Sequence, residues 1–255
     1  MTDSFVEFEG VRLSFLDRGD GVPLLWLHGL SGRDPWDAFL SRLAESYRVV
    51  VPEHPGFGST DRVPWIRDME DMALFYRSFI ETYLPADGIV LAGHSLGAWM
   101  AAEFAFRHPE RLRALVLTSP LGLLREDAPV ADVFLLEPEE FRQRAYADPD
   151  KAPPPADTTS IEWIRNRSMT AQFGWSPRLF SPRLAERLRW INRPTLLLHG
   201  ELDRIVPPSH TDLYASLLPD AQVALLPGVG HHPHHEDPEG AAVRIVQFLE
   251  KKLSP

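Results

Sequence analysis

A serine between two glycines is the residue of this sequence best suited to nucleophilic chemistry. Ser95 lies at the centre of the segment GHSLG at 93–97, after the apolar run 89–92 and before the helical stretch 98–106. A sharp turn from strand to helix lifts a serine hydroxyl out of the sheet, and flanking glycines relieve crowding around the strained backbone. We therefore predict that Ser95 is a nucleophile. The alternative is a helix-capping serine beside a tightly packed glycine.

A histidine-rich segment near the end of the chain offers the base that a serine nucleophile requires. This segment reads GVGHHPHHEDP at 228–238, and His231 comes directly after a glycine that lets the loop turn its imidazole toward the sheet. We predict that His231 is the base. We expect His232, His234 and His235 to be solvated loop residues.

The same segment raises the alternative of a metal site, because four histidines stand beside Glu236 and Asp237. Metal ligands must converge on one ion, and a contiguous loop interrupted by Pro233 is poorly suited to that. We therefore expect no metal. With no nucleotide or flavin motif found either, we expect no cofactor.

A buried carboxylate must hold the second nitrogen of the base and stabilise its imidazolium. Asp203 ends the segment HGELD at 199–203, which follows the apolar run 195–198. Glu201 is nearer the strand and less able to reach His231. We predict that Asp203 is the orienting acid. The alternative is a turn or capping aspartate ahead of Pro207.

Backbone N–H groups should stabilise the oxyanion of a tetrahedral intermediate. The segment HGL at 28–30 follows the apolar run 24–27, so the N–H of Leu30 is one predicted donor. The N–H of Leu96, directly after the serine, is the other. An ordinary turn at the end of a strand is the alternative reading of 28–30.

Short apolar runs that alternate with helical patterns predict the elements that hold these residues. A hairpin is expected over 6–9 and 12–17, and continuously apolar runs at 24–27, 49–51, 89–92, 115–117, 195–198 and 223–226 are typical of strands covered on both faces. Helical spacing marks 69–83 and 241–253. The pattern predicts an α/β protein with a doubly wound, mostly parallel sheet.

The alternation stops between about 121 and 191, where proline, arginine, glutamate and aromatic residues dominate. We predict core segments at 1–120 and 192–255 with a helical cap at 121–191. Aromatic residues over a serine site suggest a substrate of low polarity, with pocket residues Phe134, Trp163, Phe173 and Trp175. Arg165, Arg167 and Arg178 could recognise a carboxylate, but we expect them to be solvated.

Composition narrows the functional classes. The chain has 255 residues, 44% of them hydrophobic, a net charge of −10 and no cysteine. These values suit a globular protein acting on a small molecule and disfavour a nucleic-acid partner, while zero cysteines exclude thiolate catalysis. With no apolar run long enough to span a bilayer and no signal-peptide pattern, we expect a cytoplasmic protein that is a monomer or a homodimer.

Five motifs in order resemble the α/β-hydrolase superfamily nearly from end to end. They are HGL at 28–30, PGFGS at 55–59, GHSLG at 93–97, HGxxD at 199–203, and GH at 230–231 followed by ExP at 236–238. The resemblance implies an eight-stranded sheet, a cap after the sixth strand and the chain order Ser, Asp, His. Relatives commonly carry aspartate where this chain has Glu53 and His54, which we expect to be structural.

Fold alone does not choose a reaction. Members of this superfamily cleave esters, lipids, lactones and carbon–carbon bonds, and a serine rather than an aspartate at 95 disfavours the dehalogenase and epoxide hydrolase branches. We predict a carboxylic-ester hydrolase acting on low-polarity acyl or aromatic substrates through an acyl-enzyme. Carbon–carbon bond hydrolysis of the meta-cleavage type is the nearest alternative, and a slowly turning small-molecule receptor is an alternative of another class.

Overall fold

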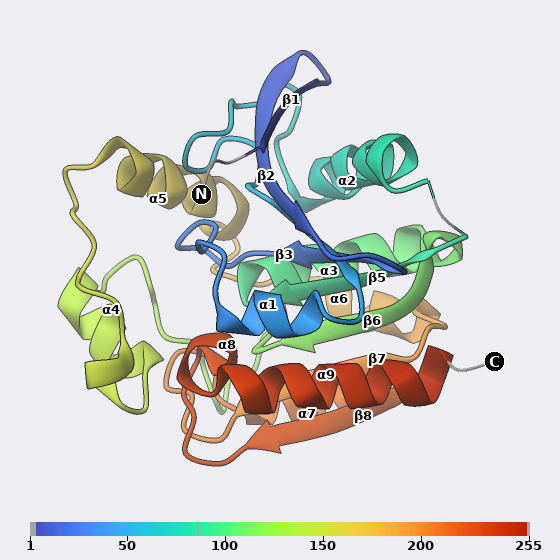
Figure 1. Cartoon of the computed structure of the whole chain (residues 1–255). Coiled ribbons are helices and arrows are strands. Elements are labelled where there is room, and N and C mark those ends of the chain that lie inside the picture. The colour runs from blue at the N-terminus through green and yellow to red at the C-terminus, as the bar shows by residue number, and fades with distance from the viewer. Residues whose placement is uncertain (1–3, 86, 254–255) are drawn as a thin grey trace.

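An eight-stranded sheet runs through the centre of the molecule and carries helices on both faces (Figure 1). The computed structural model describes residues 4–85 and 87–253. The strand order is β1-β2-β4-β3-β5-β6-β7-β8. The first two pairings, β1 with β2 and β2 with β4, are antiparallel, and the remaining strands pair in parallel. The strands are β1 Ser4–Phe8, β2 Val11–Arg18, β3 Pro23–Leu27, β4 Arg48–Pro52, β5 Ile89–His94, β6 Leu112–Thr118, β7 Thr195–Gly200 and β8 Ala221–Leu226.

These elements confirm the predicted α/β class and each predicted strand, with ends shifted by a few residues. Central strands such as β5 are buried along their whole length, as continuous apolar sequence requires. The edge strand β8 differs from the prediction, because Val223 and Leu225 are 40% and 47% exposed. Burial on both faces needs covering helices, and β8 lies where that cover ends.

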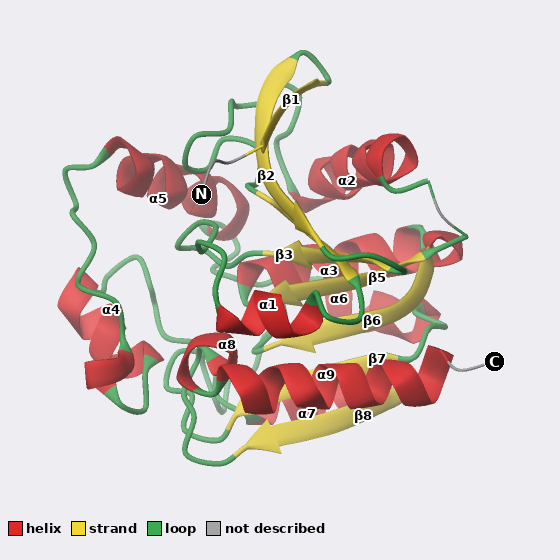
Figure 2. Cartoon of the chain, in the orientation of Figure 1, coloured by secondary structure: helices red, strands yellow, loops and turns green. Residues whose placement is uncertain are grey.

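The two faces of the sheet enclose two separate hydrophobic cores. On one face α1 (Ala38–Leu43) contacts α9 (Pro238–Leu253), and on the other α2 (Met69–Tyr83) contacts α3 (Leu96–Arg107), with α7 (Ser209–Leu217) packed on β7 and β8. Asp68 begins α2 by accepting hydrogen bonds from the N–H groups of Glu70 and Asp71. Figure 2 shows the sheet between these helical layers.

The segment between β6 and β7, where the sequence predicts a cap, is mostly helices and loops. Its elements are α4 Pro138–Ala145, α5 Ile161–Gly174, α6 Leu184–Arg187 and two short 3-10 turns, Pro149–Lys151 and Leu188–Trp190; another such turn, Pro109–Arg111, lies before β6. Helices α4 and α5, the cap helices, lie beyond the carboxyl ends of the parallel strands (Figure 1). Helix α6 instead contacts α7 of the core. Among the described helices, none is long and apolar enough to cross a membrane.

Candidate active site

Ser95 stands on a strained turn between β5 and α3. Its backbone has φ +54° and ψ −112°, a conformation that is unusual for a residue with a side chain. Its N–H donates to the carbonyl of Thr118 on β6 at 2.9 Å. A Cβ at Gly97 would overlap the backbone carbonyls of Leu27 and His28, so only glycine lets α3 approach β3 this closely. Tight packing on both sides therefore maintains the strained turn.

His231 lies in the loop between β8 and α8 (Pro233–Glu236), and its position is fixed from two directions. Its N–H donates to the carbonyl of Ala145 at the end of α4, at 2.6 Å. The Glu236 carboxylate accepts from the N–H of Gly230 and from that of Ala147, both at 2.8 Å. The same contacts therefore hold both the histidine loop and the end of a cap helix.

The structure brings Ser95, His231 and Asp203 together in hydrogen-bonding order. His231 Nε2 lies 3.0 Å from Ser95 Oγ, and His231 Nδ1 lies 2.7 Å from Asp203 Oδ2. All three residues are buried, with exposed fractions of 1%, 1% and 5%. This geometry lets His231 accept the serine proton while Asp203 holds the ring in the required tautomer.

The Asp203 carboxylate is stabilised as an anion despite its burial. Burial favours the neutral acid, but the charge of His231 and hydrogen bonds from His199 and His231 outweigh burial and lower the pKa of Asp203. Oδ1 also accepts the N–H groups of Ile205 and Val206, at 2.8 and 2.9 Å. An ionised carboxylate is the form that can stabilise an imidazolium.

A directed chain of hydrogen bonds supports the turn that carries Leu30. Tyr76 Oη contacts His54 Nδ1, and His54 Nε2 donates to the carbonyl of His28 at 3.0 Å. In return, the N–H of His54 donates to His28 Nε2 at 2.9 Å, and His28 Nδ1 donates to the carbonyl of Gly29 at 2.7 Å. Burial lowers the pKa of His28 to about 4, so both rings act as neutral partners near pH 7.

Glu53, which precedes His54 directly after β4, also makes contacts within the protein. Its carboxylate accepts from both the N–H and the hydroxyl of Ser59, at 2.8 Å each. The contacts made by Glu53 and His54 agree with the structural roles expected for both residues.

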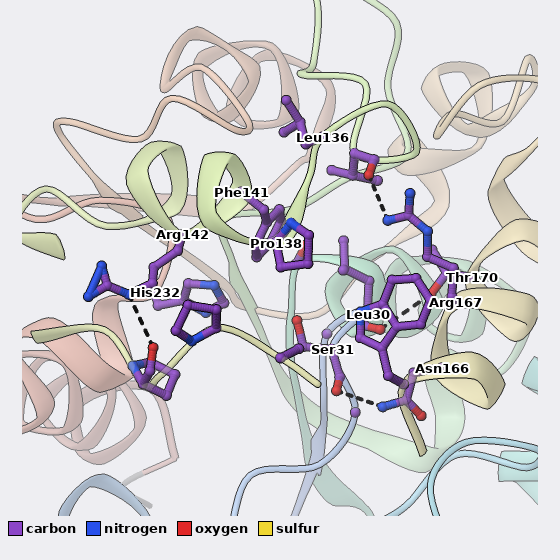
Figure 3. A pocket seen from close by; sticks show the side chains of 18 of the residues that line it. Leu30, Ser31, Leu136, Pro138, Phe141, Arg142, Asn166, Arg167, Thr170 and His232 are labelled. Carbon is purple, nitrogen blue, oxygen red and sulfur yellow. Dashed lines mark hydrogen bonds between the residues drawn. The ribbon is translucent and has the colours of Figure 1, made fainter. Parts of the chain in front are cut away.

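A cavity of about 400 Å³ opens above Ser95 between the core loops and the cap helices. Figure 3 shows Leu30 and Ser31 of the core beside Arg167 and Thr170 of α5, with Phe141 of α4 on another side. Its lining combines apolar side chains with a few polar groups, as ligand pockets commonly do. The lining includes Leu30, Ser95, Val133, Phe134, Leu136, Pro138, Phe141, Arg142, Tyr146, Trp163, Asn166, Arg167, Thr170, His231 and His232.

Asn166 joins α5 to two core loops at the rim of this cavity. Its Nδ2 donates to the carbonyl of Ser31 at 2.7 Å, as Figure 3 shows, and its Oδ1 accepts from the N–H of Gly58 at 2.8 Å. Thr170 Oγ1 adds a bond to the carbonyl of Leu30 at 3.3 Å. Helix α5 is thereby held against the turn that would carry an oxyanion donor.

A family model described as "Alpha/beta hydrolase family" matches residues 24–244, which covers both the sheet and the site. The chain belongs to the alpha/beta hydrolase family.

Relatives of this α/β hydrolase include enzymes of two kinds. It is 26% identical to a 2-hydroxy-6-oxo-6-(2'-aminophenyl)hexa-2,4-dienoic acid hydrolase of Metapseudomonas resinovorans, over 98% of this chain and 91% of that relative. It is 25% identical to Lipase 1 of Psychrobacter immobilis, over 88% of this chain and 76% of that protein. A solved meta-cleavage product hydrolase from Pseudomonas fluorescens IP01 has the same fold, with a TM-score of 0.82, 22% identity and 97% of each chain covered.

The histidines after His231 differ from their prediction as solvated residues. In this α/β hydrolase His232 and His234 are 8% and 3% exposed, and His235 is half-buried. Helix α8 folds the segment back against the sheet, where His234 contacts the rings of Trp26 and Phe39. The prediction was wrong because it treated the segment as an open loop.

The four predicted pocket aromatics divide into two pairs. Phe134 and Trp163 line the cavity of this α/β hydrolase, whereas Phe173 and Trp175 lie outside the set of described lining residues. Phe173 is 8% exposed and belongs to the hydrophobic core, and Trp175 is 55% exposed beyond the end of α5. Helical rotation points Phe173 inward to the core, and composition alone could not show this.

The three arginines expected to be solvated have partners within the protein. Arg165 donates to the carbonyl of Gly58 at 2.8 Å, and Arg167 donates to the carbonyls of Val133 and Phe134 at 2.9 and 2.6 Å. Arg178 lies 3.6 Å from an oxygen of Asp132. Because α5 crosses the neighbouring loops, arginine side chains reach backbone carbonyls there.

Several site residues were missed by sequence reasoning. Arg142 and Tyr146 line the cavity, but no motif marks them. His199 contacts Asp203 Oδ2 at 2.9 Å and stands four residues before it in the HGxxD segment. That spacing was the one sequence signal that a second histidine, besides His231, could contact Asp203.

Proposed function

We propose that this α/β hydrolase cleaves carboxylic esters of low-polarity acyl or aromatic substrates. One observation carries the proposal: Ser95 Oγ lies 3.0 Å from His231 Nε2 at the floor of the capped cavity. A hydroxyl hydrogen-bonded to a neutral imidazole, itself held by a carboxylate, can attack a carbonyl carbon.

The proposed reaction has two halves. Ser95 Oγ attacks the ester carbonyl as His231 Nε2 takes its proton. The resulting oxyanion accepts hydrogen bonds from the N–H groups of Leu30 and Leu96. Leu96 suits this role because the first N–H groups of a helix have no acceptor within the helix. The imidazolium then protonates the departing alcohol. Water activated by His231 finally releases the acid from the acyl-enzyme.

The cavity favours an apolar acyl or aromatic group. Leu136, Phe141 and Trp163 supply much of its apolar wall, whereas Asn166 and Arg167 direct their polar groups to backbone groups of the protein. Polar groups already engaged with the protein offer little to a charged substrate. A volume of about 400 Å³ falls within the usual range for small-molecule sites.

Carbon–carbon bond hydrolysis is the second proposed function. The similarity to a dienoic acid hydrolase favours it, and the same serine chemistry serves both reactions. Arg142 lines the cavity with one nitrogen on the carbonyl of Pro153 at 3.3 Å and another 3.6 Å from Glu139. Both contacts are long, so a substrate carboxylate could displace them and bind the guanidinium.

The test compares p-nitrophenyl esters from acetate to long acyl chains with a 2-hydroxy-6-oxo-hexa-2,4-dienoate substrate. Wild type and Ser95→Ala are assayed in parallel, and circular dichroism checks that the variant is folded. We expect ester turnover that the variant loses. Turnover of the dienoate alone would favour the second function, and an unchanged ester rate in Ser95→Ala would exclude the proposed nucleophile.

A further inference from the structure

Three buried histidines from two parts of the chain meet beside the serine site. His94 ends β5, while His232 and His234 come from the segment around α8. Their ring centroids lie 4.9 Å apart for His94 and His232, 4.6 Å for His94 and His234, and 5.6 Å for His232 and His234. One nitrogen of each ring lies within 4.8 Å of one nitrogen of both others.

These rings carry nitrogens that lack hydrogen-bond partners among the described residues. Both ring nitrogens of His94 are in this state, as are Nδ1 of His232 and Nδ1 of His234. The three residues are no more than 8% exposed. Buried polar atoms nearly always have a partner, so several such nitrogens in one cluster make it suited to a ligand that accepts nitrogen lone pairs.

A neighbouring carboxylate gives His234 the orientation of a metal ligand. Asp34 Oδ2 lies 3.5 Å from His234 Nε2 and 3.1 Å from His235 Nε2. With its Nε2 proton directed to a carboxylate, His234 presents the bare Nδ1 to the cluster. Histidine ligands of metals commonly have such a carboxylate on their second nitrogen.

The imidazoles are also in the protonation state that metals require. Burial lowers the pKa of His234 to about 4, and burial together with the neighbouring histidines holds the pKa values of His94 and His232 well below the usual range. Near pH 7 each ring is neutral and has one free lone pair. Neutral imidazole is the form that coordinates a metal ion.

We propose that His94, His232 and His234 form a three-imidazole site for one divalent transition-metal cation, with Zn²⁺ as the best match. Three imidazoles and one open position suit zinc, whereas calcium and magnesium prefer oxygen ligands. The rings close inward on binding, because Zn–N bonds are about 2.0 Å long. A second cluster, Asp34 with His234 and His235, is less suitable because its side chains already pair with one another.

The site lies beside the proposed base. The His231 ring is 4.8 Å from that of His94 and 5.2 Å from that of His232. A divalent cation there disfavours the His231 imidazolium that forms when Ser95 is deprotonated. Bound metal is therefore an inhibitor of turnover, a consequence that rests on the proposed function, whereas the metal site itself does not.

The decisive experiment measures Zn²⁺ binding by equilibrium dialysis and elemental analysis at pH 7.5. The chelator-treated wild type is compared with His234→Phe, which keeps an aromatic ring between Trp26 and Phe39. The matched control is His108→Gln, a histidine that packs on Phe104 outside the cluster. We expect one Zn²⁺ per chain in wild type and control, and at least tenfold weaker binding in His234→Phe.

His232→Phe and His235→Phe distinguish the two clusters. The first should lose binding, and the second should keep it. Loss in His235→Phe but not in His232→Phe would place the ion on the Asp34 cluster and overturn the proposal, as would the absence of stoichiometric binding by wild type. X-ray absorption of zinc-loaded wild type needs no variant: three imidazole ligands are expected, and a mostly oxygen shell would also overturn it.

Inhibition is measured separately from binding. Zn²⁺ should slow p-nitrophenyl ester turnover by wild type at the concentration that fills the site, and should slow His234→Phe at least tenfold less effectively relative to its own rate. Absence of ester turnover would refute the proposed function and leave the binding results intact. Equal inhibition of both proteins would overturn the inhibitory role.

Discussion

His199 and His231 contact the same oxygen, Oδ2 of Asp203, at 2.9 and 2.7 Å. Thr211 Oγ1 donates to His199 Nδ1 at 2.6 Å, which leaves His199 Nε2 to carry the proton toward the carboxylate. Two backbone N–H groups occupy Oδ1. The carboxylate is therefore held from four directions, and His199 is a positioning residue for the proposed acid.

Replacing His199 should reduce turnover without weakening substrate binding. His199→Phe removes a donor to a buried anion, which costs about 1.5–3 kcal/mol and predicts a fall in kcat of roughly 10- to 100-fold. His199→Gln keeps an N–H near the position of Nε2 and should retain most of kcat. Steady-state kinetics on the best p-nitrophenyl ester measure both, and KM should stay within about twofold because His199 lies outside the cavity lining.

His210→Phe is the control for this prediction. Like His199, His210 is buried. It lies on α7, however, and its Nε2 contacts the carbonyl of Ala128 at 2.8 Å instead of the Asp203 carboxylate. Its kcat should be close to that of wild type. If His210→Phe and His199→Phe lose activity equally, repacking around α7 explains the effect and the positioning role is refuted.

Trp163 should determine how large an acyl group the cavity accepts. Trp163→Ala removes an indole from the cavity wall and should move the optimum of the p-nitrophenyl ester series to longer chains, with kcat/KM for the longest ester relative to acetate rising about tenfold. Trp190→Ala is the matched control, because Trp190 is 64% exposed and packs away from the cavity. A chain-length profile that is the same in all three proteins would contradict the proposed acyl site.

Lowering the pH should destabilise the protein already at pH values above those at which carboxylates titrate. Burial lowers the pKa values of His28 and His234 from 6.5 to about 4, so between these values the unfolded chain binds protons that the folded chain does not. The resulting stabilisation is complete above pH 6.5 and is lost as pH falls toward 4. Between pH 7 and pH 5, each of these histidines should lower the free energy of unfolding by about 2 kcal/mol.

Urea unfolding at several pH values in chelating buffer measures this loss. The free energy of unfolding of wild type should fall steeply from pH 7 to pH 5. In His234→Phe this decrease should be smaller by about 2 kcal/mol. A free energy that is flat across this range would show that the buried histidines titrate normally in the folded protein.

Local sequence predicted the fold and the serine site because each signal was contained within a short segment. The apolar runs marked the strands, and the turn at Ser95, the loop at His231 and the segment ending at Asp203 each follow a strand. Carboxyl ends of parallel strands share one edge of the sheet, so three motifs far apart in sequence meet there.

Contacts between segments could not be predicted in this way. His94 was noticed only as a neighbour of Ser95, and its meeting with His234 depends on how α8 folds back against the sheet. Phe141 and Leu136 line the cavity because of the path that the chain takes through the cap. Outside the cap helices, no hydrophobic periodicity in the sequence predicts that path. The proposed metal site also depends on such a contact, because it joins histidines of the loop to a histidine of the strand beside it.

The most direct test of the central proposal is covalent labelling with a fluorophosphonate, a reagent that phosphonylates an activated serine. Wild type, Ser95→Ala and Asp203→Asn are treated in parallel, and the adduct is located by peptide mass spectrometry. We predict one adduct on Ser95 in wild type, none in Ser95→Ala, and labelling slowed at least 100-fold in Asp203→Asn. An adduct on another serine, or equal labelling of Ser95→Ala, would contradict the assignment of Ser95 as the nucleophile.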